Sequence, residues 1–399
     1  MIPANAVGAL AAVDPESLRG STVYVYNWGE YISDGSEGTL DVNKEFEERY
    51  GITVKYTNYA SNEDMYAKLS GGGANYDVII PSDYMIERMI AEDMLEKIDF
   101  SNVPNYKYIP EEYKGLYFDP NDEYSIPYTF GMVGLIYNKT MVKEAPDSWN
   151  VMWDEQYKDQ ILTFNNPRDA FAIAQFLMGI DINTENKDDW QKAADKLKEQ
   201  KPLIQSYVMD EVYNKMENGE AAIAPYYAGD YLTMLENNAD LGFVYPKEGT
   251  NVFVDSMCIP KGAQNKAAAE LYINFMLETD IATANANAIC YGCPHTGVQA
   301  NDDYDLKDNE VIYSDAEFMT EYFHNLSPET LALMTSLWDD VKIANVADSG
   351  VTNPDNSTKT IGKSGSNTGM YIALIAVVAV VVIAAVLGVV RKKKREKNY

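Results

Sequence analysis

Apolar side chains in the first ninety residues recur with two periods in turn, one typical of strands and one typical of helices. Residues 22–26 and 52–56 have the composition or the alternation of strands, and residues 76–81 form the continuous apolar run of a buried parallel strand. Residues 38–50 and 62–69 instead place apolar side chains at helical spacing. This alternation predicts a parallel sheet with helices on both faces.

A further helix is predicted after Ser82, a suitable N-cap residue, because Met85, Ile86, Met89 and Ile90 fall on one face. A second series of elements extends from about residue 130 to residue 251. Its predicted helices span residues 167–179, 190–200, 209–218 and 230–238.

Two extended segments connect the two series of elements. They cover residues 124–130 and 252–260, and neither has room for a turn. At 399 residues the chain is long enough for two domains of ordinary size. We therefore predict an α/β fold with two lobes, two extended hinge crossovers and a cleft beneath the hinge.

The C-terminal part of the chain has a different pattern. Residues 344–369 are rich in Asn, Ser, Thr, Gly and Asp, which predicts a flexible linker. Residues 370–390 contain no charge and would form a helix about 31 Å long, which matches a hydrocarbon core of about 30 Å. Five basic residues follow directly, so we expect a transmembrane helix, a basic cytoplasmic tail at 391–399 and a binding domain outside the membrane.

The N-terminal segment, residues 1–20, contains a short apolar run from Val7 to Val13 without a basic region before it. The preceding Ala4-Asn5-Ala6 is similar to a cleavage site with small residues. We interpret this segment as the remnant of an export signal region.

The net charge of −29 disfavours nucleic acid as a partner and favours cations. The three cysteines, Cys258, Cys290 and Cys293, are too few for a disulfide framework. Cys290 and Cys293 have the spacing of a redox pair or half a zinc site, so a local disulfide or a dithiol function stays open.

Sequence motifs of catalysis are missing. The chain has no glycine-rich phosphate loop, no Gly-x-Ser-x-Gly elbow and no helix with two histidines four residues apart. His295 and His324 are its only histidines. We expect a binding protein rather than an enzyme, with no catalytic residue, metal or cofactor.

The end of the first strand carries candidate binding residues. Trp28 and Tyr31 flank Glu30 beyond a turn at Gly29. A carboxylate between aromatic faces suits an organic ammonium group, through ion pairing and cation–π contact. The alternative is that the aromatic side chains pack on the core and Glu30 is solvated.

Five stretches, in order between about Thr22 and Lys342, resemble the spermidine/putrescine-binding proteins of bacterial ABC importers. They are 26–31 (YNWGEY), 61–69 (SNEDMYAKL), 76–82 (YDVIIPS), 124–128 (YSIPY) and 255–260 (DSMCIP). The resemblance implies a two-lobed periplasmic-binding-protein fold of type II. It also implies a linear polyamine as ligand, ABC transporter permease subunits as partners, and a monomer.

The same resemblance, together with an extra carboxylate at Asp83, defines the expected ligand-binding residues: Trp28, Glu30, Tyr31, Ser82, Asp83, Tyr84, Asn166, Asp169, Tyr226, Phe253, Asp255, Tyr291 and His324. The chain departs from the family at several of these positions. Asn166 replaces a carboxylate, Tyr226 and Phe253 replace tryptophans, and His324 replaces a glutamine. Asn166 and Asp169 also fit a plain helix start, because Pro167 suits the first helical position.

Three of these residues, Glu30, Asp169 and Asp255, are the expected counter-ions, enough for putrescine or spermidine. Asp255 follows Phe253 by two residues in an extended segment, so both side chains are expected on one face.

The expected lobes are discontinuous in the sequence. Residues 21–127 and 255–299 would form lobe 1, and residues 128–254 and 300–343 would form lobe 2. Two alternatives stay open: a ferric-iron protein of the same fold with Tyr226 and Tyr227 as ligands, and a membrane-anchored surface protein without a transport role.

Overall fold

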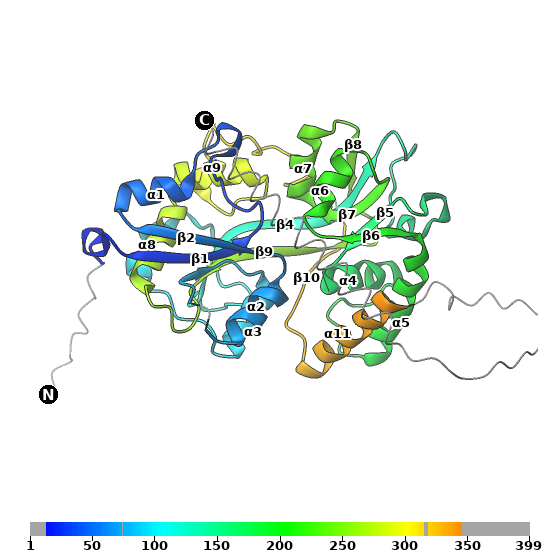
Figure 1. The fold of residues 1–399 in the computed structure, drawn as a ribbon, viewed down its shortest axis with the longest axis horizontal. Helices are drawn as coiled ribbons and strands as arrows, with labels where there is room; N and C mark the ends of the chain where they lie inside the picture. Colours follow the sequence, from blue (N-terminus) through cyan, green and yellow to red (C-terminus); the bar gives the residue numbers. More distant parts are fainter. Residues whose placement is uncertain (1–12, 74, 315–317, 345–399) are drawn as a thin grey trace, which may run out of the picture. The chain divides into compact units, whose positions relative to one another are not determined.

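The computed structural model describes residues 13–73, 75–314 and 318–344, which include a ten-stranded sheet with helices around it (Figure 1). The strands are β1 Thr22–Trp28, β2 Thr53–Tyr59, β3 Val78–Ile79, β4 Ser125–Asn138, β5 Ile161–Phe164, β6 Ile204–Val208, β7 Ile223–Tyr227, β8 Leu241–Val244, β9 Thr250–Cys258 and β10 Thr320–Tyr322. The α-helices are α1 Val42–Tyr50, α2 Asn62–Ser70, α3 Asp83–Ala91, α4 Pro167–Met178, α5 Lys187–Gln200, α6 Glu211–Glu217, α7 Ala228–Asn237, α8 Lys266–Met276, α9 Thr279–Ile289, α10 Thr296–Gln299 and α11 Pro328–Ile343.

The strand order is β2-β1-β3-β9-β4-β7-β5-β6, with β10 beside β9 and β8 beside β4. β1 is parallel to β2 and β3, and β5 is parallel to β6 and β7. β4 and β9 are antiparallel to each other and lie between these two parallel groups. Figure 1 shows β4 and β9 running together from the group with β1 and β2 to the group with β5 and β6.

The segments predicted as crossovers fall in these two long strands. The first half of β4 pairs with β9, from Ser125 opposite Cys258 to Met132 opposite Val252. The second half of β4 pairs with β7 and β8 instead. β9 pairs with β3 of the first parallel group and β4 pairs with β7 of the second, so the two strands together connect the groups.

Two large apolar clusters lie around this connection. Val23, Val25 and Phe46 pack with Tyr272 of α8 in one of them. The other contains Phe171 and Trp190 and also reaches Tyr26 and Met85 of the first group, so it extends across the connection. Helices pack on both parallel groups, as the alternating pattern predicted.

Local signals explain most element boundaries. α1 begins at Val42 rather than at Gly38, because the Asp41 carboxylate accepts a hydrogen bond from the amide of Lys44 and caps the helix there. It ends at Gly51, whose φ of 63° is left-handed. The apolar run at 76–81 contributes only two paired residues, Val78 and Ile79.

The predicted location in the cell membrane needs correction. No helix in the described ranges is long and apolar enough to cross a bilayer. Residues 370–390, where the transmembrane helix was predicted, lie outside the described residues, as do the predicted linker from residue 345 onward, the tail at 391–399 and residues 1–12. We therefore withdraw the membrane anchor and the localisation that depended on it.

The three cysteines are free thiols and all are buried. Burial raises the pKa of Cys290 to about 11 and that of Cys293 to about 12. Both side chains are therefore protonated at neutral pH, which disfavours thiolate chemistry.

Candidate functional site

The turn after β1 is held by the fully buried Asn27. Its amide group donates to the carbonyl of Tyr31 and to the hydroxyl of Tyr56, and its side-chain oxygen accepts from the amide of Trp28. These bonds fix the positions of Trp28 and Tyr31, whereas Glu30 is exposed at a left-handed φ of 48°.

A cavity lies between the residues of the two strand groups. Of the expected binding residues, all except Glu30 and His324 line it: Trp28, Tyr31, Ser82, Asp83, Tyr84, Asn166, Asp169, Tyr226, Phe253, Asp255 and Tyr291. Their ligand roles remain predictions, but the chain brings them together from segments more than 250 residues apart.

Asp255 is a buried carboxylate of which one oxygen lacks a hydrogen-bond donor among the described residues. It lies in β9 with 4% of its surface exposed, and its Oδ2 accepts the Tyr31 hydroxyl at 2.6 Å. Its Oδ1 is buried and has no hydrogen-bond partner among the described residues. Burial raises the pKa of Asp255 to about 6, an effect that the hydroxyls of Tyr31 and Ser82 partly offset. A buried acceptor without a partner is costly, so this oxygen is suited to a ligand donor.

Asp169 lies in the first turn of α4, with 3% of its surface exposed. It accepts the Tyr227 hydroxyl at 2.8 Å and the Asn166 amide at 2.6 Å. Burial raises the pKa of Asp169 to about 7. Asn166 also accepts a hydrogen bond from the amide of Arg168, so it caps α4 and lines the cavity at once.

Asp83 has a different environment from the other carboxylates. It is fully buried, and its oxygens accept the amides of Tyr84 and Val254, which tie α3 to β9. Burial raises the pKa of Asp83 well above its ordinary value. These bonds suit a positioning role rather than a free counter-ion.

Asn62, in the first turn of α2, organises the two neighbours of Asp83. Its amide group donates to the hydroxyls of Ser82 and Tyr84. The Tyr84 hydroxyl in turn donates to Glu63 at 3.0 Å. Both hydroxyls are therefore oriented by α2.

Aromatic rings form the apolar walls. The ring of Phe253 lies 5.5 Å from that of Tyr227 and 6.1 Å from that of Tyr291. Gly131 makes room for it, because a Cβ there would lie 2.7 Å from the Phe253 ring. Tyr226 stacks on Phe164 at 5.3 Å and is 2% exposed. Such walls can cover methylene groups.

Sequence reasoning missed several lining residues: Gly29, Tyr59, Ala60, Asn62, Met209, Asp210, Tyr227, Asp230, Asn251 and Phe323. Asp230 was recognised only as the start of a predicted helix. Helical periodicity does not tell which helix N-terminus faces the cavity, so the missing signal was the packing of α7.

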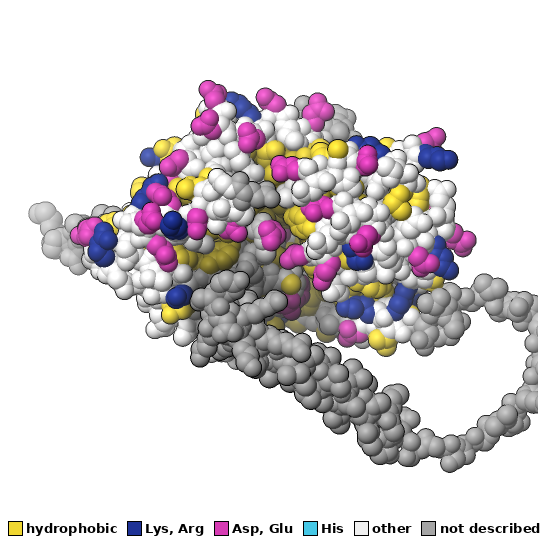
Figure 2. Space-filling view, turned by 45° about the horizontal axis from the view of Figure 1, so that its top comes forward, with side chains coloured by type: hydrophobic (Ala, Val, Ile, Leu, Met, Phe, Trp, Pro, Cys, Tyr) yellow, Lys and Arg dark blue, Asp and Glu magenta, His cyan; other side chains and the backbone are white. Residues whose placement is uncertain are grey.

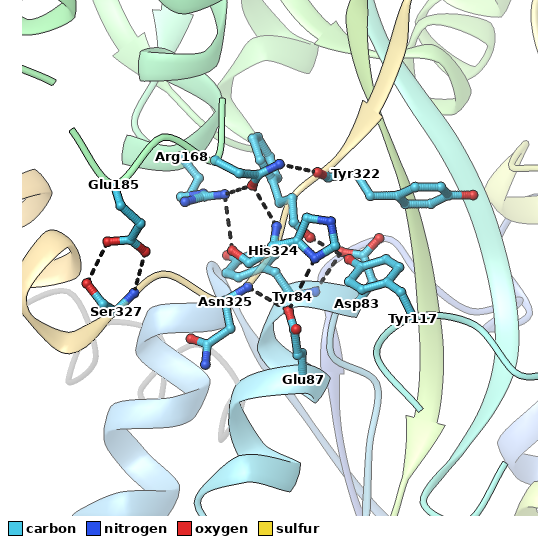
Figure 3. Close-up of polar contacts among 12 residues, drawn as sticks. Asp83, Tyr84, Glu87, Tyr117, Arg168, Glu185, Tyr322, His324, Asn325 and Ser327 are labelled. Carbon is cyan, nitrogen blue, oxygen red and sulfur yellow. Dashed lines mark hydrogen bonds and ion pairs between the residues drawn. The ribbon is translucent and has the colours of Figure 1, made fainter. Parts of the chain in front are cut away.

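His324 lies outside the cavity, in the segment between β10 and α11 (Figure 3). Its ring contacts that of Tyr117 at 4.3 Å, and its Nδ1 lies 3.7 Å from Glu87 of α3. The neighbouring amide of Asn325 donates to the same Glu87 carboxylate at 2.7 Å. Figure 3 also shows Arg168, whose guanidinium donates to the His324 carbonyl.

The charge of the cavity lining is entirely negative. Among the described residues, no Lys, Arg or His lines it. Figure 2 shows acidic side chains spread over the face of the molecule that is in view. No group of three or more His, Cys, Asp or Glu suited to a metal occurs in the described ranges. Buried carboxylates between aromatic walls suit an elongated organic cation.

Comparisons with known proteins agree with this chemistry. A family described as bacterial extracellular solute-binding protein matches residues 74–321. The spermidine/putrescine-binding periplasmic protein of Escherichia coli (strain K12) is 32% identical over 300 residues, covering 74% of this chain and 84% of the relative. The putrescine-binding periplasmic protein PotF of the same strain is 27% identical over 359 residues, with 84% and 95% covered.

Similarity extends to solved structures. The spermidine/putrescine ABC transporter substrate-binding protein PotD from Streptococcus pneumoniae superposes with a TM-score of 0.67 and 33% sequence identity. The match covers 81% of this chain and 99% of that chain. The overall α/β architecture is thus shared with a periplasmic-binding-protein fold.

Proposed function

Because this chain belongs to the family of bacterial extracellular solute-binding proteins, we propose that it captures a polyamine in its cavity and delivers it to an ABC permease. Spermidine and putrescine are the ligands that its relatives' names indicate. The family is a class of transport proteins rather than of enzymes.

The proposal rests mainly on the buried carboxylate of Asp255. Its Oδ1 is buried, with no hydrogen-bond partner in the described part of the chain, in a cavity walled by tyrosines and Phe253. A polyamine offers what this cavity lacks, namely ammonium groups for the carboxylates and methylenes for the rings. Desolvating an ammonium group costs several kcal/mol unless an anion meets it, so diamines and triamines should be favoured over neutral solutes.

The fold supplies a means of capture. We infer a type II arrangement in which β4 and β9 act as the two hinge crossovers. Residues 21–127 and 255–299 would form one lobe, and residues 128–254 and 300–343 the other. Closure of the lobes would exclude water and strengthen the attraction between carboxylates and ammonium groups. The closed form, as a monomer, would then be recognised by the permease.

The experiment is a thermal-shift and calorimetric comparison of the full chain with putrescine, cadaverine, spermidine and lysine. A ligand present at a hundred times its dissociation constant should stabilise the protein by about 2.7 kcal/mol, which raises the melting temperature. Polyamines should do this and lysine should not. Absence of binding by every polyamine would contradict the proposal.

A further inference from the structure

Arg168, the second residue of α4, is the only buried Lys or Arg among the described residues, with 2% of its surface exposed. It does not line the cavity, but its guanidinium lies behind two rings that do. It is 4.4 Å from the ring of Phe323 and 5.6 Å from that of Tyr84 (Figure 3). Burying a charge is costly, so a cation in this place calls for a physical reason.

The guanidinium of Arg168 is held in place without a bond to a carboxylate. Its Nη2 donates to the side-chain oxygen of Asn183 at 3.1 Å and to the carbonyl of His324 at 3.4 Å, and both acceptors are neutral. Its Nε and Nη1 are buried and have no hydrogen-bond partner among the described residues. The positive charge therefore acts on its surroundings through space, and in a buried environment this action is strong.

Asp169 follows Arg168 directly in the first turn of α4. Its carboxylate accepts hydrogen bonds from two neutral donors, the hydroxyl of Tyr227 and the amide of Asn166. Burial raises the pKa of Asp169 to about 7, and the attraction of Arg168 is one of the effects that oppose this rise. Since no Lys, Arg or His of the described residues lines the cavity, Arg168 is the cation that favours the ionised carboxylate before a ligand binds.

The other titratable groups that face Asp169 do not supply a positive charge. They are Glu63 of α2, Tyr84 of α3, and Tyr226 and Tyr227 of β7. Burial raises the pKa values of the three phenols well above their ordinary value, so they are neutral from pH 7.5 to 9.0. Glu63 is a buried acid that raises the pKa of Asp169 further. Arg168 therefore acts against both burial and Glu63.

We propose that Arg168 is a positioning residue that keeps Asp169 ionised within the buried cavity, so that this carboxylate can pair with a ligand ammonium group near neutral pH. The inference rests on the proposed function and deepens it, because it names what maintains the charge of one expected counter-ion. An arginine that only joined α4 to the segment around His324 would have no effect on the titration of Asp169.

The test compares the affinity of the full chain for spermidine at pH 7.5 and 9.0, by titration calorimetry, between the parent and Arg168→Gln. Without the positive charge a smaller fraction of Asp169 is ionised at pH 7.5, so the dissociation constant should rise about tenfold. At pH 9.0 the carboxyl group is ionised in both proteins, and the variant should bind at most about twofold more weakly. Both proteins meet the same ligand at each pH, so titration of spermidine itself cancels.

Three further proteins serve as controls. In an Asp169→Asn background, Arg168→Gln should change the affinity by the same factor at both pH values, because the titrating group is gone. Asn183→Ala removes an acceptor of Nη2 but keeps both charges, and should retain the pH dependence of the parent. Arg19→Gln removes a charge at an exposed position and should bind like the parent at both pH values.

The folding of each variant is checked by circular dichroism and by its melting temperature without ligand. Arg168→Met is a second uncharged variant, whose side chain can still pack on the ring of Phe323, and the same result is expected of it. If neither uncharged variant folds, Arg168 serves the fold and the inference is overturned.

The outcomes separate this inference from the proposed function. If the parent binds no polyamine, the proposed function fails, and NMR titration of the Asp169 carboxyl in the ligand-free chain decides on Arg168. Its midpoint should move from about 7 in the parent to about 8 or higher in Arg168→Gln. If the parent binds spermidine but Arg168→Gln weakens it equally at both pH values, the role of Arg168 is overturned. A pH-dependent loss that persists in the Asp169→Asn background would also overturn it, because the effect would then come from Glu63.

Discussion

Three carboxylates in the cleft are buried in surroundings that disfavour their ionised form. Asp169, Asp230 and Asp255 are enclosed by aromatic side chains, and burial raises the pKa of Asp169 to about 7 and that of the other two to about 6. Each is relieved only in part by a tyrosine hydroxyl. The ligand-free protein therefore carries an electrostatic cost that a bound cation removes.

This cost predicts opposite pH responses of stability and of binding. The folded-state pKa of each group is raised, so the folded protein binds more protons than the unfolded chain between about pH 4 and 7, and these groups stabilise it as the pH falls. Without ligand, lowering the pH from 7.5 to 5.0 should raise their contribution to the free energy of unfolding by roughly 5 kcal/mol. Scanning calorimetry at both pH values measures it.

Lowering the pH should weaken polyamine binding, although it stabilises the ligand-free protein. At pH 5.0 the three carboxyl groups are largely protonated and no longer pair with ammonium groups, so the dissociation constant for spermidine should rise at least tenfold. An affinity that is the same at pH 5.0 and 7.5 would contradict the assignment of Asp169 and Asp255 as counter-ions.

The position of a side chain could be predicted from the sequence where it follows from a strand, although its ligand role stays a prediction. Asp255 and Phe253 share one face of β9 because strand periodicity demands it, and both line the cavity. The positions of Glu30 and Asp230 relative to the cavity could not be predicted in this way. The direction of Glu30 depends on a left-handed residue in a turn, and that of Asp230 on the packing of α7 against Tyr291.

At the scale of elements, α3 and the segment before α11 make a second contact, beside the cavity that Phe323 helps to line. Glu87 of α3 accepts the amide of Asn325, and the Tyr117 hydroxyl donates to the carbonyl of Phe323 (Figure 3). None of these atoms belongs to a predicted counter-ion. They join the lobe that we infer for α3 to the one that we infer for α11.

Removal of the contact between Glu87 and Asn325 should weaken polyamine binding, although neither residue is expected to contact the ligand. In Glu87→Ala the closed form loses a hydrogen bond to a charged group, about 1.5–3 kcal/mol, and part of that loss appears as weaker affinity. We expect a three- to tenfold higher dissociation constant for spermidine, mainly through faster release in stopped-flow measurements. Glu48→Ala, which changes an exposed acid of α1, is the control. Unchanged release by Glu87→Ala would exclude a role for this contact in closure.

Most of the elements before residue 260 could be predicted, because their periods and caps are local. Ser61 caps α2, and Asn166 with Pro167 starts α4, as their residue types suggest. The short β3 was overestimated because an apolar run does not reveal how many of its residues find a partner strand. Strands β5, β6, β7, β8 and β10 were not assigned, since the pairing of each depends on a neighbour far away in the sequence.

At the scale of the whole molecule, two groups of elements on either side of β4 and β9 together form the cavity. The sequence predicted these two strands as connections, and the paired register from Ser125 to Met132 explains how they hold the two groups together. The division into lobes and their movement remain proposals. The predicted membrane location was wrong, because no helix in the part of the chain that the structure describes is long and apolar enough to cross a bilayer.

The most direct test of the account is the affinity of Asp255→Asn for spermidine, measured by titration calorimetry on the full chain at pH 7.5. The substitution keeps the shape and removes the charge, so a buried ammonium group loses its partner, at a cost of about 3–5 kcal/mol. The dissociation constant should rise by roughly a hundred- to several-thousand-fold. Asp240→Asn, at an exposed position, should bind like the parent. If Asp255→Asn binds spermidine within threefold of the parent, the ligand does not lie against Asp255 and the site is wrong.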